Sequence, residues 1–162
     1  MRASARAAAR KPKRGGVKNL LCVVASAETL PGPLRGRADR VSIILPWGSL
    51  LRGLIEPRDE LVTRVRALCR SGASLEIVAS YGPRDQHDEE DSLILDEAHA
   101  RRLIARYQDL GFAGATVERV PLTELRGYPT TWAKRLGFGR PREVYRIRAR
   151  AAVTPSDTAG CR

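Results

Sequence analysis

The chain has 162 residues, of which 43% are hydrophobic and 29% charged, a composition typical of a globular domain and not of a disordered chain. No apolar run approaches the roughly 20 residues that a membrane-spanning helix needs. The basic, alanine-rich amino terminus lacks the apolar segment of a secretory signal, which leaves a transit peptide as the alternative interpretation. Three cysteines without metal or redox spacing favour a reducing cytoplasm.

The charge is strongly unbalanced. Lysine and arginine total 29 against 18 acidic residues, which gives a net charge of +11 and favours a polyanionic partner, nucleic acid before membrane. A genome rich in arginine codons would produce the same excess. The distribution favours the functional interpretation, because the basic residues gather at 2–18 and 134–150, while a turn-rich segment at 85–91 is acidic. We interpret that acidic segment as a solvated loop in preference to a metal site.

The predicted secondary structure alternates between strands and helices. Short apolar runs bounded by turn residues indicate buried strands, and apolar residues at helical spacing indicate amphipathic helices. In chain order the predicted elements are a helix at 2–10, strands at 20–25 and 41–45, a helix at 57–70, a strand at 74–80, a helix at 96–110, and strands at 116–120 and 144–150.

This order predicts an α/β fold whose sheet is parallel in its first part. The last two predicted strands have no helix between them, so we expect them to pair antiparallel around the loop at 121–143. Residues 151–162 carry little pattern and are expected to fray as a tail.

Two tryptophans lie where a ligand contact is plausible on physical grounds. Trp47 directly follows Pro46, which ends a predicted strand, so it is expected at the carboxyl edge of the sheet, where open α/β folds bind ligands. The alternative is a tryptophan that caps the core. Trp132 lies in a loop beside Lys134 and Arg135, a setting that is harder to explain as core.

Four segments together resemble the family of 16S rRNA adenine-1408 N1-methyltransferases of the KamB and NpmA type. The segments are ARKPKRGG (9–16), SAETLP (26–31), LPWGSLLRG (45–53) and WAKRLGFGR (132–140). The resemblance runs from about Arg2 to Arg148. It implies a class I (Rossmann-like) SAM-dependent methyltransferase sheet over residues 1–150. It also implies S-adenosyl-L-methionine (SAM) as cofactor, 16S rRNA of the assembled 30S subunit as partner, and aminoglycoside resistance as the outcome.

The resemblance also assigns roles to individual residues. Trp47 and Trp132 would sandwich the target adenine after it leaves the RNA stack. SAM would be bordered by Ser26, Ala27 and Glu28 at its adenine end, by Pro46 and Ser49 at its methionine part, and by the hydroxyl of Thr130. Phosphates of the rRNA would be held by Arg10, Lys11, Lys13, Arg14, Lys134, Arg135, Arg140 and Arg142.

The implied reaction needs little acid–base chemistry. Adenine N1 carries a free lone pair once exposed, so methyl transfer is mainly a matter of alignment. Two aromatic faces would stabilise the cationic product ring by about 1–2 kcal/mol when desolvated, and stacking helps to offset the cost of flipping the base. Neither of the two histidines lies in a catalytic context.

Part of the family sheet has no counterpart in the sequence. A class I methyltransferase holds SAM with a glycine-rich turn after its first strand and an acid at the end of its second. By resemblance Met1 falls in the helix after that second strand, so the sheet lacks its first two strands. We therefore expect the chain alone to bind SAM poorly and to methylate little. The alternatives are a non-catalytic basic RNA-binding module and an unrelated basic α/β protein.

Overall fold

A computed structural model describes residues 23, 25–27, 29–81, 95–128 and 143–153. Its elements are the 3-10 helix η2 (Gly32–Leu34), strand β1 (Ala38–Ile44), helices α2 (Gly48–Ile55) and α3 (Asp59–Leu68), strand β2 (Cys69–Tyr81), helix α4 (Glu97–Asp109), strand β3 (Phe112–Arg119), the 3-10 helix η4 (Leu122–Gly127) and strand β4 (Glu143–Ala151). The predicted helix at 2–10 lies outside the described residues. Of the predicted strand at 20–25 only Val23 and Ala25 are described, and neither lies in a strand.

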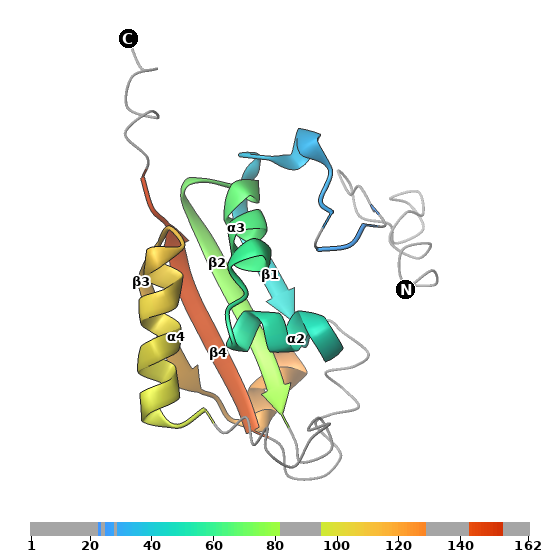
Figure 1. The fold of residues 1–162 in the computed structure, drawn as a ribbon. Helices are drawn as coiled ribbons and strands as arrows, with labels where there is room; N and C mark the ends of the chain where they lie inside the picture. The colour runs from blue at the N-terminus through green and yellow to red at the C-terminus, as the bar shows by residue number, and fades with distance from the viewer. Residues whose placement is uncertain (1–22, 24, 28, 82–94, 129–142, 154–162) are drawn as a thin grey trace, which may run out of the picture.

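The described strands form one mixed sheet in the order β1-β2-β4-β3 (Figure 1). β1 and β2 pair in parallel, whereas β4 pairs antiparallel with both β2 and β3. The parallel first part and the antiparallel last pair are therefore confirmed. Because β1 and β2 run in the same direction, their carboxyl ends meet at one edge of the sheet, close to the start of β4.

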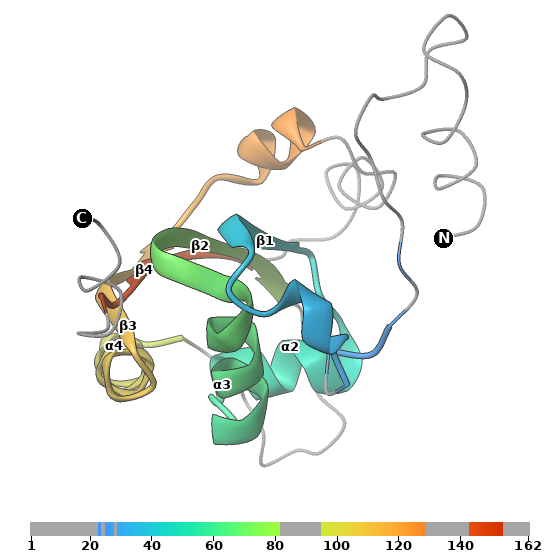
Figure 2. The same ribbon diagram turned by 90° about the horizontal axis from the view of Figure 1, so that it is seen from above.

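The two faces of the sheet are covered differently. Figure 2 shows α2, α3 and α4 together on one side, whereas η4 lies on the other. The main apolar cluster fills the space between the sheet and the three helices, and a second, smaller cluster lies beneath η4. The second cluster is the one that borders the carboxyl edge of β1.

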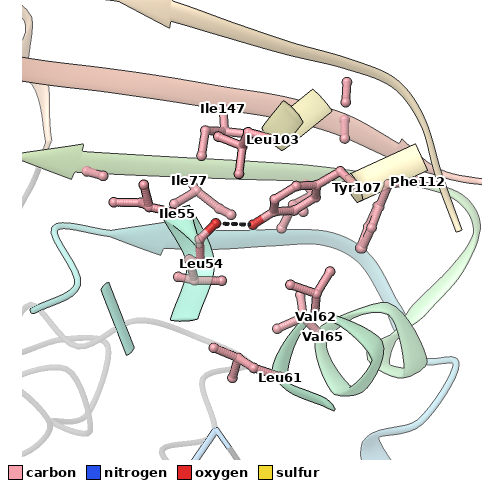
Figure 3. Close-up of a cluster of buried hydrophobic side chains, with 14 of the residues drawn as sticks. Leu54, Ile55, Leu61, Val62, Val65, Ile77, Leu103, Tyr107, Phe112 and Ile147 are labelled. Atoms are coloured by element: carbon pink, nitrogen blue, oxygen red, sulfur yellow. Dashed lines mark hydrogen bonds between the residues drawn. The ribbon is translucent and has the colours of Figure 1, made fainter. Parts of the chain in front are cut away.

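The main cluster joins the helices to the sheet through large buried side chains (Figure 3). Tyr107 of α4 is 1% exposed, and its hydroxyl donates a hydrogen bond to the carbonyl oxygen of Leu54 in α2 at 3.0 Å. Its ring lies 5.9 Å, centroid to centroid, from that of Phe112. One side chain thus links two helices and the start of β3.

The predicted helices at 57–70 and 96–110 are confirmed as α3 and α4. Asp59 and Glu60 lie in the first turn of α3, at the positive end of its dipole. At α4, the Asp96 carboxylate caps the helix by accepting a hydrogen bond from the backbone amide of His99 at 2.6 Å.

The sequence misplaced several boundaries. α3 ends at Leu68, not at the Ser71–Gly72 pair, and the chain enters β2 directly at Cys69. Gly72 has φ +76° and lies within β2, opposite an irregularity in the pairing with β1. The glycine therefore permits an irregular strand where it had been interpreted as a helix end. The short helix α2, which contains two glycines, was not predicted.

Candidate functional site

The turn that follows β1 has an unusual backbone. Leu45 has φ +52° and is the one non-glycine residue in the described part of the chain with a positive φ. Its amide donates a hydrogen bond to the carbonyl oxygen of Val78 at 2.7 Å, and its side chain is 6% exposed. Gly48, also at positive φ, completes the turn. A left-handed leucine costs about 1–2 kcal/mol, so its surroundings must hold it in place.

The turn separates a buried proline from an exposed tryptophan. Pro46 is buried, whereas Trp47 is 82% exposed at the carboxyl edge of the sheet. The alternative that Trp47 caps the core is therefore wrong. Tryptophan is enriched at binding interfaces, where its large ring contributes much of the contact energy. Trp47 is available to stack against a partner.

The amino terminus of α2 faces the same edge of the sheet. Trp47 occupies the N-cap position of α2 and makes no side-chain capping hydrogen bond. Ser49 lies exposed in the first turn of this helix. The first-turn amides of a helix and its dipole favour a negatively charged group, so this end suits a carboxylate or phosphate.

A small apolar cluster supports the turn from the face of the sheet that lacks α2, α3 and α4. Its buried members come from the turn, β2, the residue after β3, η4 and β4, and they are Leu45, Val78, Val120, Leu125 and Val144. The turn and η4 are therefore packed against the same side chains.

An arginine holds η4 to the sheet by ion pairs. The Arg146 side chain on β4 is 11% exposed, and its Nη1 lies 3.0 Å from the Glu118 carboxylate on β3. Its Nη2 pairs with Glu124 of η4 and donates to the Tyr128 hydroxyl at 3.4 Å. Nε lies 3.5 Å from the Glu76 carboxylate. The hydrogen bond to Glu124 raises the Arg146 pKa further, so this cation is permanent.

The structure describes five of the residues that the sequence assigned to the site. Trp47, Pro46 and Ser49 lie together on the turn and the start of α2. Ser26 and Ala27 lie in a separate turn, in which the Ser26 carbonyl accepts a hydrogen bond from the Thr29 amide at 3.2 Å and Ala27 packs against the main cluster. The remaining assigned residues lie outside the described part of the chain: Arg10, Lys11, Lys13, Arg14, Glu28, Thr130, Trp132, Lys134, Arg135, Arg140 and Arg142.

Sequence reasoning missed the two residues that support the turn and η4. Nothing in the sequence marks Leu45 as left-handed, because a leucine before a proline usually reads as extended backbone. Arg146 was counted with the basic residues of 134–150, but carboxylates from β2, β3 and η4 surround it. The available signal was the alternation of apolar and basic residues in VYRIRAR (144–150), since alternation places every second residue of β4 on one face.

The comparisons with known proteins identify the family. A family profile described as 16S rRNA (adenine(1408)-N(1))-methyltransferase, NpmA, matches residues 1–151. The chain belongs to this family. The family's relative from Escherichia coli is 32% identical over 145 residues, covering 85% of this chain. The relative from Streptoalloteichus tenebrarius is 36% identical over 146 residues, covering 86% of this chain. Both carry the name 16S rRNA (adenine(1408)-N(1))-methyltransferase. The chain spans 65% of the length of each of these relatives.

Solved structures of the family share the fold. The enzyme from Catenulisporales acidiphilia superposes with a TM-score of 0.80 at 35% identity, over 94% of this chain and 72% of that one. The 16S rRNA methyltransferase KamB gives a TM-score of 0.80 at 30% identity, over 94% and 72% of the two chains. A mutant of the Catenulisporales acidiphilia enzyme was solved with the cosubstrate SAM, and it superposes with a TM-score of 0.82 at 34% identity. The four described strands are thus part of a class I methyltransferase sheet.

Two further features bear on the chemistry that the described residues offer. Within the described ranges, there is no group of three or more histidine, cysteine, aspartate or glutamate side chains that could hold a metal ion. Of the helices that the structure describes, none is long and apolar enough to cross a membrane.

Proposed function

We propose that this chain serves methyl transfer from SAM to N1 of the decoding-site adenine of 16S rRNA, in the 30S subunit in the cytoplasm, with aminoglycoside resistance as the result. The observation that carries the proposal is Trp47, which is 82% exposed on a strained turn at the carboxyl edge of the sheet. The two residues before it, Leu45 and Pro46, are buried and fix the start of the turn.

Trp47 is proposed to stack on the flipped target adenine, with Trp132 on the opposite face of the base. An exposed indole offers a flat surface of the size of a purine, and stacking repays part of the cost of unpairing the base. As N1 acquires positive charge during methylation, the indole face stabilises it by cation–π attraction, by about 1–2 kcal/mol. Trp47 would therefore bind the transition state more tightly than the ground state.

The described residues fit one part of SAM. Ser49 and the uncapped amino terminus of α2 suit the methionine carboxylate, because helix amides and the dipole favour an anion there. Ser26 and Ala27 are proposed to border the adenine end, together with Glu28, and Thr130 is proposed to contribute its hydroxyl. When bound, SAM supplies a methyl group that its sulfonium already activates.

The chain's residues are proposed to orient the base and not to move protons. Adenine N1 attacks through its own lone pair, so alignment supplies most of the rate. His99 is engaged elsewhere, since its Nε2 lies 3.0 Å from the carbonyl oxygen of Ile55. The proposed phosphate-binding residues are Arg10, Lys11, Lys13, Arg14, Lys134, Arg135, Arg140 and Arg142.

The proposal is tested by incubating residues 1–162 and 30S subunits with saturating SAM, followed by reverse transcription across the decoding site. N1 methylation blocks base pairing, so we expect a stop at this adenine. The stop should vanish in Trp47→Ala. No stop at saturating SAM would contradict the proposal.

The rival function is a non-catalytic RNA-binding module. The net charge of +11 favours it. A purely electrostatic binder has no use for an exposed tryptophan on a strained turn, which is why we prefer the enzyme. If Trp47→Ala leaves every property of the complex with 30S subunits unchanged, the rival function is correct.

A further inference from the structure

The face of the sheet opposite α2, α3 and α4 is hollowed at the end away from Trp47. Figure 2 shows that η4 lies over only part of this face. A depression of about 640 Å³ lies over β1, β2, β4 and β3, and the residues that line it include Arg40, Ser74, Glu76, Arg148 and Arg150. We name Arg40, Arg148 and Arg150 the basic sheet face.

The strand register brings these arginines together. Arg40 of β1 and Arg150 of β4 both pair with Ser74 of β2, so the three residues form one row across the sheet. Directly paired residues point to the same face, and neighbouring strands lie about 4.8 Å apart, so the two arginines start about 10 Å apart. Arg148, two residues earlier on β4, pairs with Glu76, two residues later on β2.

Carboxylates neutralise some of the positive charge on this face, but not all of it. Arg148 lies 3.3 Å from the Glu118 carboxylate and 3.7 Å from that of Glu76. Both of these acids also contact Arg146. Among the described residues, neither Arg40 nor Arg150 has a carboxylate within ion-pair distance.

Within the described part of the chain, the side chains of Arg40 and Arg150 leave most of their donors for a partner. Arg150 Nη1 makes one long contact, 3.5 Å, with the carbonyl oxygen of Gly72. Both residues are exposed, and both line the depression. A guanidinium fork matches a phosphate in shape and charge, so two such groups with a serine hydroxyl between them suit phosphate oxygens.

We propose that the basic sheet face binds the phosphate backbone of RNA, as a contact separate from the site at Trp47. The lining of the depression includes no exposed large apolar side chain, which argues against insertion into a membrane. The depression is open to solvent, as a backbone contact requires. This inference takes the identity of the polyanion from the proposed function, and it can fail or hold independently of methylation.

The test is the salt dependence of binding to a 16S rRNA transcript. Each phosphate contact contributes about 0.7–0.9 to the slope of log affinity against log salt. The double variant Arg40→Gln/Arg150→Gln should therefore lower the slope by about 1.4–1.8 and weaken binding about 25- to 60-fold at 0.1 M salt. Each single variant should lower the slope by about half as much, so one misfolded variant would not obscure the result.

The matched control removes the same charge from another surface. Arg64 and Arg101 lie on α3 and α4, on the helical side of the sheet, and pair with Glu60 and Glu97. Arg64→Gln/Arg101→Gln should leave the slope unchanged. Equal slopes for both double variants would overturn the proposal, since net charge alone would then explain the binding. So would a wild-type chain that does not bind the transcript.

Two further readouts separate this proposal from its alternatives. Loss of binding to vesicles containing anionic lipid in Arg40→Gln/Arg150→Gln, with the RNA slope unchanged, would assign the face to a membrane and overturn the RNA contact. If the slope falls as expected in Arg40→Gln/Arg150→Gln but the wild-type chain does not methylate 30S subunits, the proposed function is wrong and this inference still holds. The urea midpoint should be unchanged in both double variants.

Discussion

The backbone amide of Leu45 donates to the carbonyl oxygen of Val78 at 2.7 Å, and both side chains are buried in the same apolar cluster. This pair fixes the end of β1 to β2 just where the chain turns left-handed. The turn then buries Pro46 and exposes Trp47. The strain at Leu45 is therefore connected directly to the placement of the residue that we propose to stack on adenine.

The first prediction concerns the order of two substitutions at Leu45. Both Leu45→Ala and Leu45→Gly remove the buried side chain, at about 2–5 kcal/mol of unfolding free energy. Glycine accepts a positive φ without steric cost, whereas alanine does not. Leu45→Gly should therefore be the more stable of the two by about 1 kcal/mol, as measured by urea unfolding.

The control for this prediction is Leu75, which is 1% exposed on β2 and has no positive φ. At an ordinary strand position glycine is the poorer residue, so Leu75→Gly should be less stable than Leu75→Ala. The same order at Leu45 as at Leu75 would mean that the left-handed conformation of Leu45 carries no strain.

The second prediction separates stability from function at Trp47. Trp47→Ala should change the unfolding free energy by less than about 0.5 kcal/mol, because the side chain is 82% exposed. Methylation of 30S subunits should be lost, while the salt slope of rRNA binding stays the same. Trp47→Phe should keep part of the activity, since a smaller ring still stacks. A large loss of stability in Trp47→Ala would instead indicate a structural role.

The third prediction concerns the buried cation beneath η4. Arg146→Met should destabilise the fold by about 3 kcal/mol, because Glu124 would lose its cation and Glu76 and Glu118 would keep only Arg148. Chemical unfolding measures the difference. The matched variant is Arg101→Met, whose pair with Glu97 is exposed and 3.8 Å long, and it should cost less than about 0.5 kcal/mol. Equal costs would mean that burial adds nothing to this ion pair.

The prediction from sequence succeeded where a local pattern determines the structure. The helix at 96–110 was predicted from its amphipathic spacing, and the structure has it as α4, with Asp96 as its cap. The position of Trp47 at the carboxyl edge of the sheet followed from a proline at the end of an apolar strand. The antiparallel last pair followed from the absence of a helix between two strand patterns.

The prediction from sequence failed where residues distant in the sequence determine the local structure. The charge of Arg146 reads as part of a basic cluster until β2, β3 and η4 bring three carboxylates to it. The left-handed Leu45 depends on a hydrogen bond to Val78, a strand away. The length of β2 depends on Gly72, which the sequence offers equally well as a helix end or an irregular strand position. A short window of sequence does not settle any of these: the alternation at 144–150 gives the face of Arg146 but not its partners.

The last prediction concerns alkaline pH. Burial raises the pKa of the Tyr107 hydroxyl above its ordinary value of 10, and burial together with Glu143 raises that of Tyr145 to about 12. The unfolded chain therefore loses these protons at a lower pH than the folded chain. Their contribution to stability is complete below pH 10 and falls as the pH rises above it, by at most about 1.4 kcal/mol per pH unit for a single group.

Tyr107→Phe tests this sign. At pH 8 the variant should be about 1 kcal/mol less stable than the wild type, because it loses the hydrogen bond to the Leu54 carbonyl (Figure 3). Above pH 10 the difference should shrink and then reverse, since phenylalanine has no proton to lose. The control Ile77→Val, at a fully buried core position, should cost about 1 kcal/mol equally at pH 8 and pH 11. A constant difference between Tyr107→Phe and the wild type across this range would show that Tyr107 ionises alike in the folded and unfolded chains.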